Sequence, residues 1–332
     1  MRCLTLADAL ADKGADCTFV CRKANGNLLE LIENRGFKSH ALPADVTAEQ
    51  DWMQTNAFIE TLKHKPLWLV VDHYNLDIEW ERHIRPVVYN TMVIDDMANR
   101  KHMCELLLDQ NLVPDMSHRY KDLIEGRCVE LFGPKYALLR DEFAEERKQV
   151  TKRKFPPESI LVNFGGGDHK SMCLMTMRAL KMAGYKGKVT LVAGGLNPDM
   201  DELEALATAR PNTEFHKTTN KMATLMREAD LAIGASGSTT WERMCLGLPC
   251  VTIAIAENQV EIASFLGKHH YAFYAGLAND IITESFAEYL EEVLADEEKF
   301  RGIEQYSMDH VDGKGAHFVA DIMLDKDNGV LK

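Results

Sequence analysis

Several features are absent from this 332-residue sequence, and each absence excludes a class of protein. No apolar run approaches the roughly 18 residues of a membrane-spanning helix, and the N-terminus lacks the pattern of a secretory signal. The eight cysteines form no CxxC pair and show no zinc-site spacing. We therefore expect a cytoplasmic protein with reduced thiols and no membrane partner.

Positive charge is also scarce. The 38 Lys and Arg residues stand against 51 Asp and Glu residues, and the net charge of −13 repels nucleic acid. Anionic small molecules remain compatible, because backbone amides at helix starts bind phosphate whatever the net charge. The histidines form no HExxH pair, and Asp199 and Asp201 are expected to open a helix rather than bind a metal. No metal and no other cofactor is predicted.

What the sequence does contain is a repeated alternation of short apolar strands and amphipathic helices. This alternation is typical of parallel α/β sheets with helices on both faces. The segment at 133–158, which holds GPKY, a charged run and the pair Pro156-Pro157, separates two series of such elements. We expect a Rossmann-like domain at 1–140, a second at 155–310, and a C-terminal helical tail at 311–332. The expected strands lie at 16–21, 39–42, 67–71, 87–94 and 105–108, then at 159–164, 188–193, 213–216, 231–234 and 249–255.

The first series begins in an unusual way. Residues 1–14 have the pattern of a helix, whereas a doubly wound domain normally begins with a central strand and a glycine-rich ligand loop. One interpretation is that the N-terminal domain lacks its first strand and loop. The other is a sheet that starts with the strand at 16–21, and spacing alone leaves both open.

Residues 234–242, GASGSTTWE, carry the strongest local motif. A strand runs into a turn of small residues and then a helix, so unpaired N–H groups and the helix dipole point at one spot, as in an anion site. Glu242 is placed to accept hydrogen bonds from ribose hydroxyls. A capping box between Thr239 and Glu242 explains the same pattern without a ligand, and spacing leaves both interpretations open. The candidate ligand-binding residues of this motif are Ser236, Gly237, Ser238, Thr239 and Glu242.

Three further segments follow expected strands. Residues 163–168, NFGGGD, form a second strand–turn–helix corner in which Gly166 permits close ligand approach. Asn258 follows the strand at 249–255 and offers an amide donor and acceptor. Tyr74 follows the strand at 67–71. Taken alone, each of these residues is explained without a ligand by a structural glycine, a polar loop or packing, but adjacent strand ends of one parallel sheet share a crevice.

The motifs together resemble known families. SGSTTWERMCLGLP at 236–249 resembles the UDP-binding helix of two-domain GT-B glycosyl transferases, typified by the peptidoglycan N-acetylglucosaminyl transferase. A closer resemblance covers nearly the whole chain and is to the UDP-2,4-diacetamido-2,4,6-trideoxy-β-L-altropyranose hydrolase family of pseudaminic acid biosynthesis. The motifs that carry it are MRCLTLA at 1–7, VDHYNLDIEWE at 71–81, VIDDMANRKH at 93–102, LLLDQN at 106–111, GPKYALLRDEF at 133–143, FGGGD at 164–168, ADLAIGASGSTTWER at 229–243 and AENQ at 256–259.

The resemblance implies a GT-B-like fold of two Rossmann-like domains facing a cleft. It also implies metal-free attack of water on the anomeric carbon of a UDP-linked sugar, with inversion and release of UDP. Tyr74 would lie near the sugar, and Gly166 and the corner at 236–240 near the diphosphate. Glu242 would hold the ribose, and Asn258 would contact the diphosphate or the sugar.

The same resemblance implies a histidine base in a GxGH loop just before the helix that begins MRCLTLA, a place that precedes Met1. No catalytic residue is therefore named within the chain, and we expect residues 1–332 to bind UDP with little hydrolysis. His73 belongs to the shared motif and is not expected to replace the base. Two other functions remain open: a glycosyl transferase that passes the sugar to an acceptor, and a non-catalytic UDP-sugar-binding protein.

Overall fold

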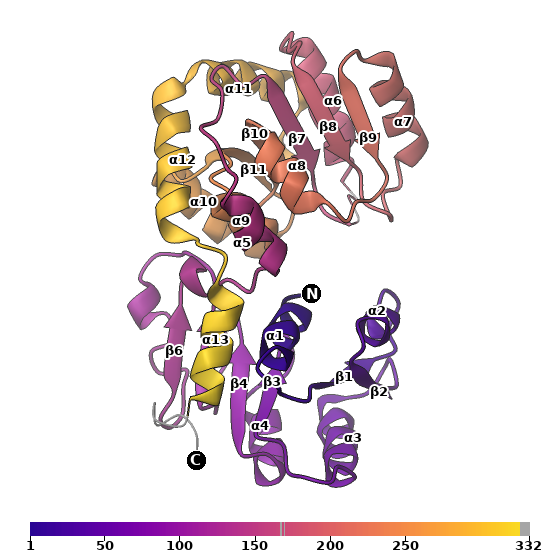
Figure 1. Ribbon diagram of the computed structural model, residues 1–332, viewed down its shortest axis with the longest axis vertical. Helices are drawn as coiled ribbons and strands as arrows, with labels where there is room; N and C mark the ends of the chain where they lie inside the picture. The colour runs from indigo at the N-terminus through magenta and orange to yellow at the C-terminus, as the bar shows by residue number, and fades with distance from the viewer. Residues whose placement is uncertain (167, 169, 326–332) are drawn as a thin grey trace. The chain divides into compact units, whose positions relative to one another are not determined.

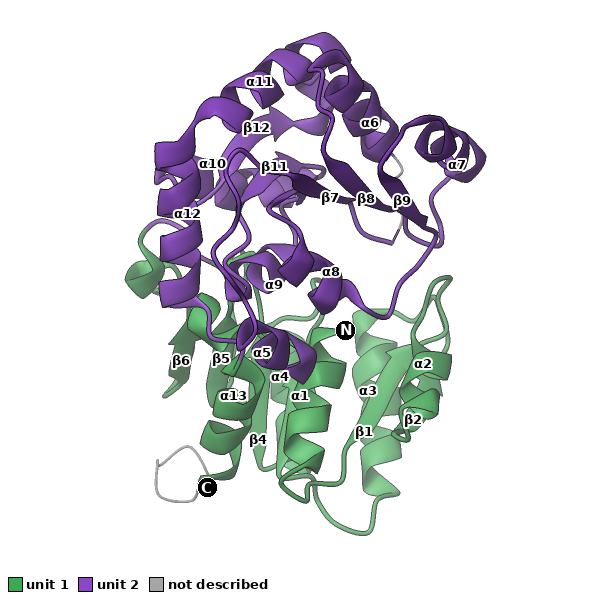
Figure 2. Ribbon diagram, turned by 45° about the horizontal axis from the view of Figure 1, so that its top comes forward, with its two compact units in different colours: residues 1–111, 115–139, 314–332 green, residues 112–114, 140–313 purple. Residues whose placement is uncertain are grey.

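The computed structural model describes residues 1–166, 168 and 170–325. The chain divides into two compact units, coloured separately in Figure 2. Unit 1 comprises residues 1–111, 115–139 and the segment from 314 onward, and unit 2 comprises 112–114 and 140–313. Within the described ranges, none of the helices combines the length and apolar character that crossing a bilayer requires.

Unit 1 contains alternating helices and parallel strands (Figure 1). Its helices are α1 (Arg2–Ala11), α2 (Leu29–Asn34), α3 (Ala48–Glu60), α4 (Ile78–Ile84) and α13 (Gly315–Leu324), with short 3₁₀ turns at Arg85–Val87, Met116–His118 and Pro134–Tyr136. Its strands are β1 (Thr18–Arg22), β2 (Lys38–Leu42), β3 (Trp68–Val71), β4 (Asn90–Ile94), β5 (Leu106–Asp109) and β6 (Val129–Phe132).

The strands of unit 1 form two separate parallel sheets. β1 pairs with β2, and the other four strands have the order β3-β4-β5-β6. The strand expected at 16–21 therefore begins a sheet, as the second interpretation has it, but that sheet contains β2 and not the strands β3 to β6. The physical reason is that β1 and β3 share no partner strand among the described residues, so each lies at the edge of its own sheet.

Helices cover both faces of the larger sheet, because successive side chains of a strand point to opposite faces. Met92 and Leu106 are buried in a cluster with apolar residues of α1 and α13. Val93 and Leu107 are buried in another cluster with residues of α3 and α4. The segment treated above as a C-terminal tail thus returns to unit 1, where α13 lies beside α1 (Figure 1). Residues 326–332 of that segment lie outside the described residues.

Unit 2 contains one larger sheet with helices on both faces. Its helices are α5 (Asp141–Arg147), α6 (Met172–Met182), α7 (Met200–Ala209), α8 (Met222–Glu228), α9 (Thr239–Cys245), α10 (Val260–Lys268), α11 (Thr283–Ala295) and α12 (Glu297–His310), with 3₁₀ turns at Glu257–Gln259 (η4) and Ala278–Asp280. Its strands are β7 (Ser159–Asn163), β8 (Lys188–Val192), β9 (Thr213–His216), β10 (Leu231–Ala235), β11 (Cys250–Ala254) and β12 (Phe273–Leu277).

The strand order of this sheet is β12-β11-β10-β7-β8-β9, and all neighbours are parallel. From the centre of the sheet, β7, β8 and β9 therefore follow one another toward one edge. The chain then crosses back to the centre, and β10, β11 and β12 follow one another toward the opposite edge. This is the doubly wound order, and its switch point lies between β7 and β10. Ligands of such sheets bind at the carboxyl ends of the strands beside the switch point.

Candidate functional site

The two corners singled out in the sequence follow β7 and β10, the strands on either side of the switch point. The register aligns Gly234 of β10 with Asn163 of β7. A Cβ at position 234 would lie only 2.3 Å from the carbonyl oxygen of Asn163, so glycine is required there. The Asn163 side chain also donates a 2.9 Å hydrogen bond to the carbonyl of Val192, which joins the end of β7 to the end of β8.

The turn after β10 presents free backbone donors. The N–H groups of Thr240 and Trp241 donate to the carbonyls of Gly237 and Ser238, which closes the turn. For the N–H groups of Gly237, Ser238 and Thr239, no acceptor is found among the residues that the structure describes. Ser238 is exposed, and Gly237 and Thr239 are half-buried, so the turn lies at the surface. Consecutive free N–H groups at such a corner favour an anion.

Ser236 has a different environment from the rest of the motif. Its side chain is 1% exposed, its hydroxyl lies 2.6 Å from the hydroxyl of Thr252, and its N–H donates to the carbonyl of Ile253. These bonds tie the end of β10 to β11. Ser236 therefore stabilises the turn through a buried side chain, and we leave it out of the proposed ligand contacts.

The capping box between Thr239 and Glu242 is not formed. Helix α9 begins at Thr239, and its N-cap residue is Ser238, which makes no side-chain capping bond. The Thr239 hydroxyl accepts a 3.2 Å hydrogen bond from Arg243 instead. The purely structural explanation of the Thr239–Glu242 spacing is thereby removed.

Glu242 lies in an unusual electrostatic environment. Its carboxylate is largely buried, and the nearest cation is the Arg140 guanidinium, at 3.8 Å, which also lies 2.8 Å from Glu142. Burial raises the pKa of Glu242 to about 7, against the opposing charges of Arg140 and Arg243 and with the support of Glu142. A carboxylate in such a place is a candidate for ligand binding.

Arg243 was not predicted from the sequence as part of the site. Its side chain is 3% exposed and lies behind the turn. The guanidinium donates to the carbonyl of Ala235 at 2.7 Å and to the hydroxyls of Thr239 and Thr240. In the sequence, Arg243 is simply a charged residue of a predicted helix. Its position there does not indicate that its side chain is buried.

The glycine corner after β7 lies at the same edge of the sheet. Gly165 has a φ of 94°, and Gly166 is exposed. A Cβ at Gly194, in the turn after β8, would lie 2.2 Å from the Gly165 carbonyl, so the two turns are in close contact. Asp168 is buried and caps α6 by accepting from the N–H groups of Met172 and Cys173. Gly167 lies outside the described residues.

Asn258 is exposed in η4, directly after β11. The neighbouring Gln259 accepts a 3.1 Å hydrogen bond from the N–H of Ile255, and its side-chain nitrogen would lie 3.7 Å from a Cβ at Gly237. The η4 turn is therefore next to the turn after β10. The structure thus brings the turns after β7, β10 and β11 together, as expected for adjacent strands of one sheet.

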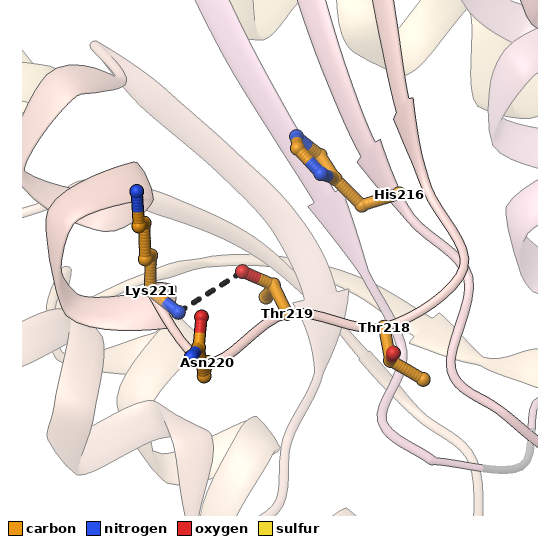
Figure 3. Close-up of a pocket in the computed structure, with 5 residues that line it drawn as sticks. All are labelled: His216, Thr218, Thr219, Asn220 and Lys221. Atoms are coloured by element: carbon orange, nitrogen blue, oxygen red, sulfur yellow. Dashed lines mark hydrogen bonds between the residues drawn. The ribbon is translucent and has the colours of Figure 1, made fainter.

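A cavity of about 610 Å³ lies farther along this edge, at the end of β9 (Figure 3). A Cβ at Gly195 would lie 3.2 Å from the Thr218 methyl group, which places the cavity beside the turn after β8. The Thr219 hydroxyl accepts a 3.0 Å hydrogen bond from the N–H of Lys221. None of the residues that line it was predicted from the sequence; they are His216, Thr218, Thr219, Asn220 and Lys221.

Tyr74 belongs to unit 1 and follows β3. It is 51% exposed, and its hydroxyl donates a 3.4 Å hydrogen bond to Asp96. Arg2 forms ion pairs with Asp72 at 2.7 Å and with Asp96 at 3.0 Å. Burial opposes ionisation of Asp72, but the hydrogen bonds and charge of Arg2 hold its pKa below the usual value. The helix that follows, α4, is capped by Asp77 and not by Asp72.

The sequence is similar to those of proteins with a named activity or pathway. No protein-family model matches it. It is 26% identical over 263 residues to the UDP-2,4-diacetamido-2,4,6-trideoxy-beta-L-altropyranose hydrolase of Campylobacter jejuni. The matched region covers 79% of this chain and 89% of that protein. The chain resembles this hydrolase family, as its motifs predicted. It is also 27% identical over 209 residues to the spore coat polysaccharide biosynthesis protein SpsG of Bacillus subtilis, covering 62% of this chain and 61% of that protein.

Solved structures share the fold over nearly the whole length. MurG of Acinetobacter baumannii matches with a TM-score of 0.70 at 14% identity, covering 97% of this chain and 94% of that one. UGT89C1 of Arabidopsis thaliana, complexed with UDP, matches with a TM-score of 0.62 at 10% identity, covering 96% and 95%. At these identities the likeness establishes the fold alone. The predicted GT-B-like fold with two Rossmann-like domains is confirmed.

Proposed function

We propose that the chain binds a UDP-linked sugar and that its enzymatic role is to hydrolyse the bond between the sugar and the diphosphate. The observation that carries this proposal is the turn after β10. Free N–H groups at Gly237, Ser238 and Thr239 stand beside the switch point of a doubly wound sheet, next to the carboxylate-bearing helix α9. Backbone donors suit the diphosphate, and a carboxylate suits the ribose.

Each part of the nucleotide is assigned by its chemistry. The diphosphate oxygens accept from the N–H groups of 237–239 and lie against the exposed turn at Gly166. Two vicinal ribose hydroxyls donate to Glu242, because an ionised carboxylate accepts several hydrogen bonds at once. Asn258, exposed on the adjoining η4 turn, contacts the diphosphate or the sugar.

The substrate class is proposed from the Campylobacter relative. It is a UDP-linked 2,4-diacetamido-2,4,6-trideoxy sugar, converted to free sugar and UDP in pseudaminic acid biosynthesis. Water attacks the anomeric carbon with inversion and without a metal, and Tyr74 contacts the sugar. The proposal assigns no residue as the acceptor of the proton that the attacking water loses.

A glycosyl transferase is the second candidate, because the solved structures with this fold include MurG and a UDP-bound UGT89C1. The two enzymes differ in what receives the sugar. A hydrolase needs only water, whereas a transferase needs an acceptor molecule. A non-catalytic UDP-sugar-binding protein is the third candidate. It would show binding with no turnover at all, whereas the hydrolase is expected to release free sugar slowly.

The test combines titration calorimetry with UDP and proton NMR of the UDP-sugar mixed with protein alone. Free sugar formed in proportion to UDP, first in the inverted anomeric form and unaffected by a chelator, supports the hydrolase. Turnover that requires an added acceptor supports the transferase. Absence of UDP binding contradicts every function proposed for the corner at 234–242.

A further inference from the structure

Arg243 is a buried cation, and no close counter-ion for it is found among the described residues. Its side chain is 3% exposed, and its hydrogen bonds go to one carbonyl and two hydroxyls, all of them uncharged. Glu242 is within the field of this charge, but no carboxylate oxygen lies within 4.0 Å of the guanidinium in the part of the chain that the structure describes. The Arg243 Nε atom is buried and has no hydrogen-bond partner among these residues.

Burying a guanidinium with no anion beside it is costly. Removing a charge from water costs several kcal/mol even after relaxation, and partial charges on carbonyls and hydroxyls offset only part of this. Buried charges are normally paired with an opposite charge or bound to an ion. The uncompensated cation lies directly behind the turn whose N–H groups at 237–239 are free.

We propose that Arg243 is the positioning residue and counter-charge that makes this turn selective for a diphosphate. This inference rests on the proposed function. The guanidinium holds the turn through Ala235 and orients the Thr239 hydroxyl, which accepts from Arg243 and so has its own hydrogen free to donate to a phosphate oxygen. The positive charge then favours the anion at short range in a poorly solvated place.

A purely structural role for the same side chain predicts a different result. An arginine that only pins the turn acts through its planar fork of donors, so Arg243→Lys would lose as much affinity for UDP as Arg243→Met. A counter-charge is kept by lysine, so Arg243→Lys would recover part of that affinity. Uridine and UDP share the base and the ribose and differ in the diphosphate, so this pair shows whether a loss falls on the diphosphate, and the lysine variant separates the two roles.

Arg153 supplies the matched control. It is also an almost fully buried arginine of unit 2, and it donates to the carbonyls of Met226, Ala229 and Leu246. Ala229 precedes β10 and Leu246 follows α9, so Arg153 lies at the amino end of the sheet, away from the turn. Glu304 and Asp230 lie in its field. Arg153→Met therefore removes a buried guanidinium without changing the charge behind the corner.

The experiment measures binding of UDP and of uridine to the full chain, to Arg243→Met, to Arg243→Lys and to Arg153→Met. Calorimetry is used for UDP and ligand-observed NMR at millimolar concentration for uridine. For Arg243→Met we expect the affinity for UDP to fall by between about tenfold and about a hundredfold, because this is the contribution of a hydrogen bond to a charged group. The affinity for uridine is expected to change little. Arg243→Lys keeps the charge without the planar fork and recovers part of the preference for UDP.

Arg153→Met is expected to lower the thermal midpoint and to leave the ratio of UDP to uridine affinity unchanged. An equal loss of UDP and uridine affinity in Arg243→Met overturns the proposal, as does an unchanged UDP affinity. If Arg243→Met does not fold, the ratio of UDP affinity to uridine affinity in Arg243→Lys decides. A lysine variant that shows no preference for UDP also overturns the proposal. Failure of the unaltered chain to bind UDP contradicts the proposed function itself, which distinguishes the two failures.

Discussion

The Arg140 guanidinium lies 3.8 Å from the carboxylate of Glu242, at the point where the chain enters unit 2. Arg140 also contacts Glu142 at 2.8 Å, so two carboxylates share one cation. This arrangement links ligand binding to protonation, because burial raises the pKa of Glu242 to about 7.

Affinity for UDP is expected to rise with pH. Glu242 is mainly protonated below its raised pKa of about 7 and ionised above it, and the ionised form accepts ribose hydroxyls more strongly. Binding is measured from about pH 6 to about pH 8.5, a range around the ordinary pKa of a titrating phosphate group. In Glu242→Gln only the titration of UDP itself remains. The difference between the curves of affinity against pH for the unaltered chain and for this variant is therefore due to Glu242. Identical curves would refute the assignment.

Substitutions of Arg140 and of Glu142 are expected to shift the pH dependence of UDP affinity in opposite directions. Arg140→Met removes the nearest cation and raises the pKa of Glu242 further, so the rise in UDP affinity shifts to higher pH. Glu142→Gln removes a like charge and shifts the rise to lower pH. The shift of the midpoint is the measurement, and shifts in the same direction in both variants would contradict the electrostatic explanation.

The role of Glu242 in holding ribose can be measured with a modified ligand. Glu242→Gln is expected to weaken UDP binding by about tenfold, because charge-assisted hydrogen bonds to the hydroxyls become neutral ones. The affinity for 2′,3′-dideoxy-UDP, which has neither hydroxyl, is expected to be unchanged by the same substitution. Equal losses for both ligands would show that Glu242 acts on some other part of the nucleotide.

Gly234→Ala is expected to destabilise unit 2 by about 1–3 kcal/mol, the usual cost of overpacking. The new methyl group would lie 2.3 Å from the Asn163 carbonyl, so the strands on either side of the switch point must separate. Gly302→Ala is the control. Gly302 lies within α12, and a Cβ there meets nothing within 4 Å, so stability is expected to rise by as much as about 1 kcal/mol. Urea unfolding measures both, and an unaffected Gly234→Ala would contradict the close approach.

Tyr74→Phe is expected to separate sugar binding from nucleotide binding. The phenolic hydroxyl donates to Asp96 at 3.4 Å from an exposed ring, so its loss changes stability by less than about 0.5 kcal/mol. UDP affinity is expected to stay the same, and the affinity for the UDP-sugar is expected to fall. An equal effect on UDP and UDP-sugar would argue against a contact with the sugar.

Much of the fold was predictable because buried parallel strands are short apolar runs. The strands at 67–71 and 188–193 were expected from such runs, and β3 and β8 occupy them. The corner at 234–242 was predictable for a similar reason, since small residues between a strand and a helix leave N–H groups free. The order of the strands was not predictable from these local patterns, because pairing joins segments far apart in the chain.

The sequence by itself determined the alternation of elements, the place of the two glycine-rich corners and the family resemblance. Only the tertiary structure separated the strands of unit 1 into two sheets, returned α13 to unit 1 and removed the capping-box explanation of Glu242. It also placed Arg243 behind the turn and Arg140 beside Glu242. The physical reason is that burial and charge depend on neighbours from other elements, and no spacing along the chain records them.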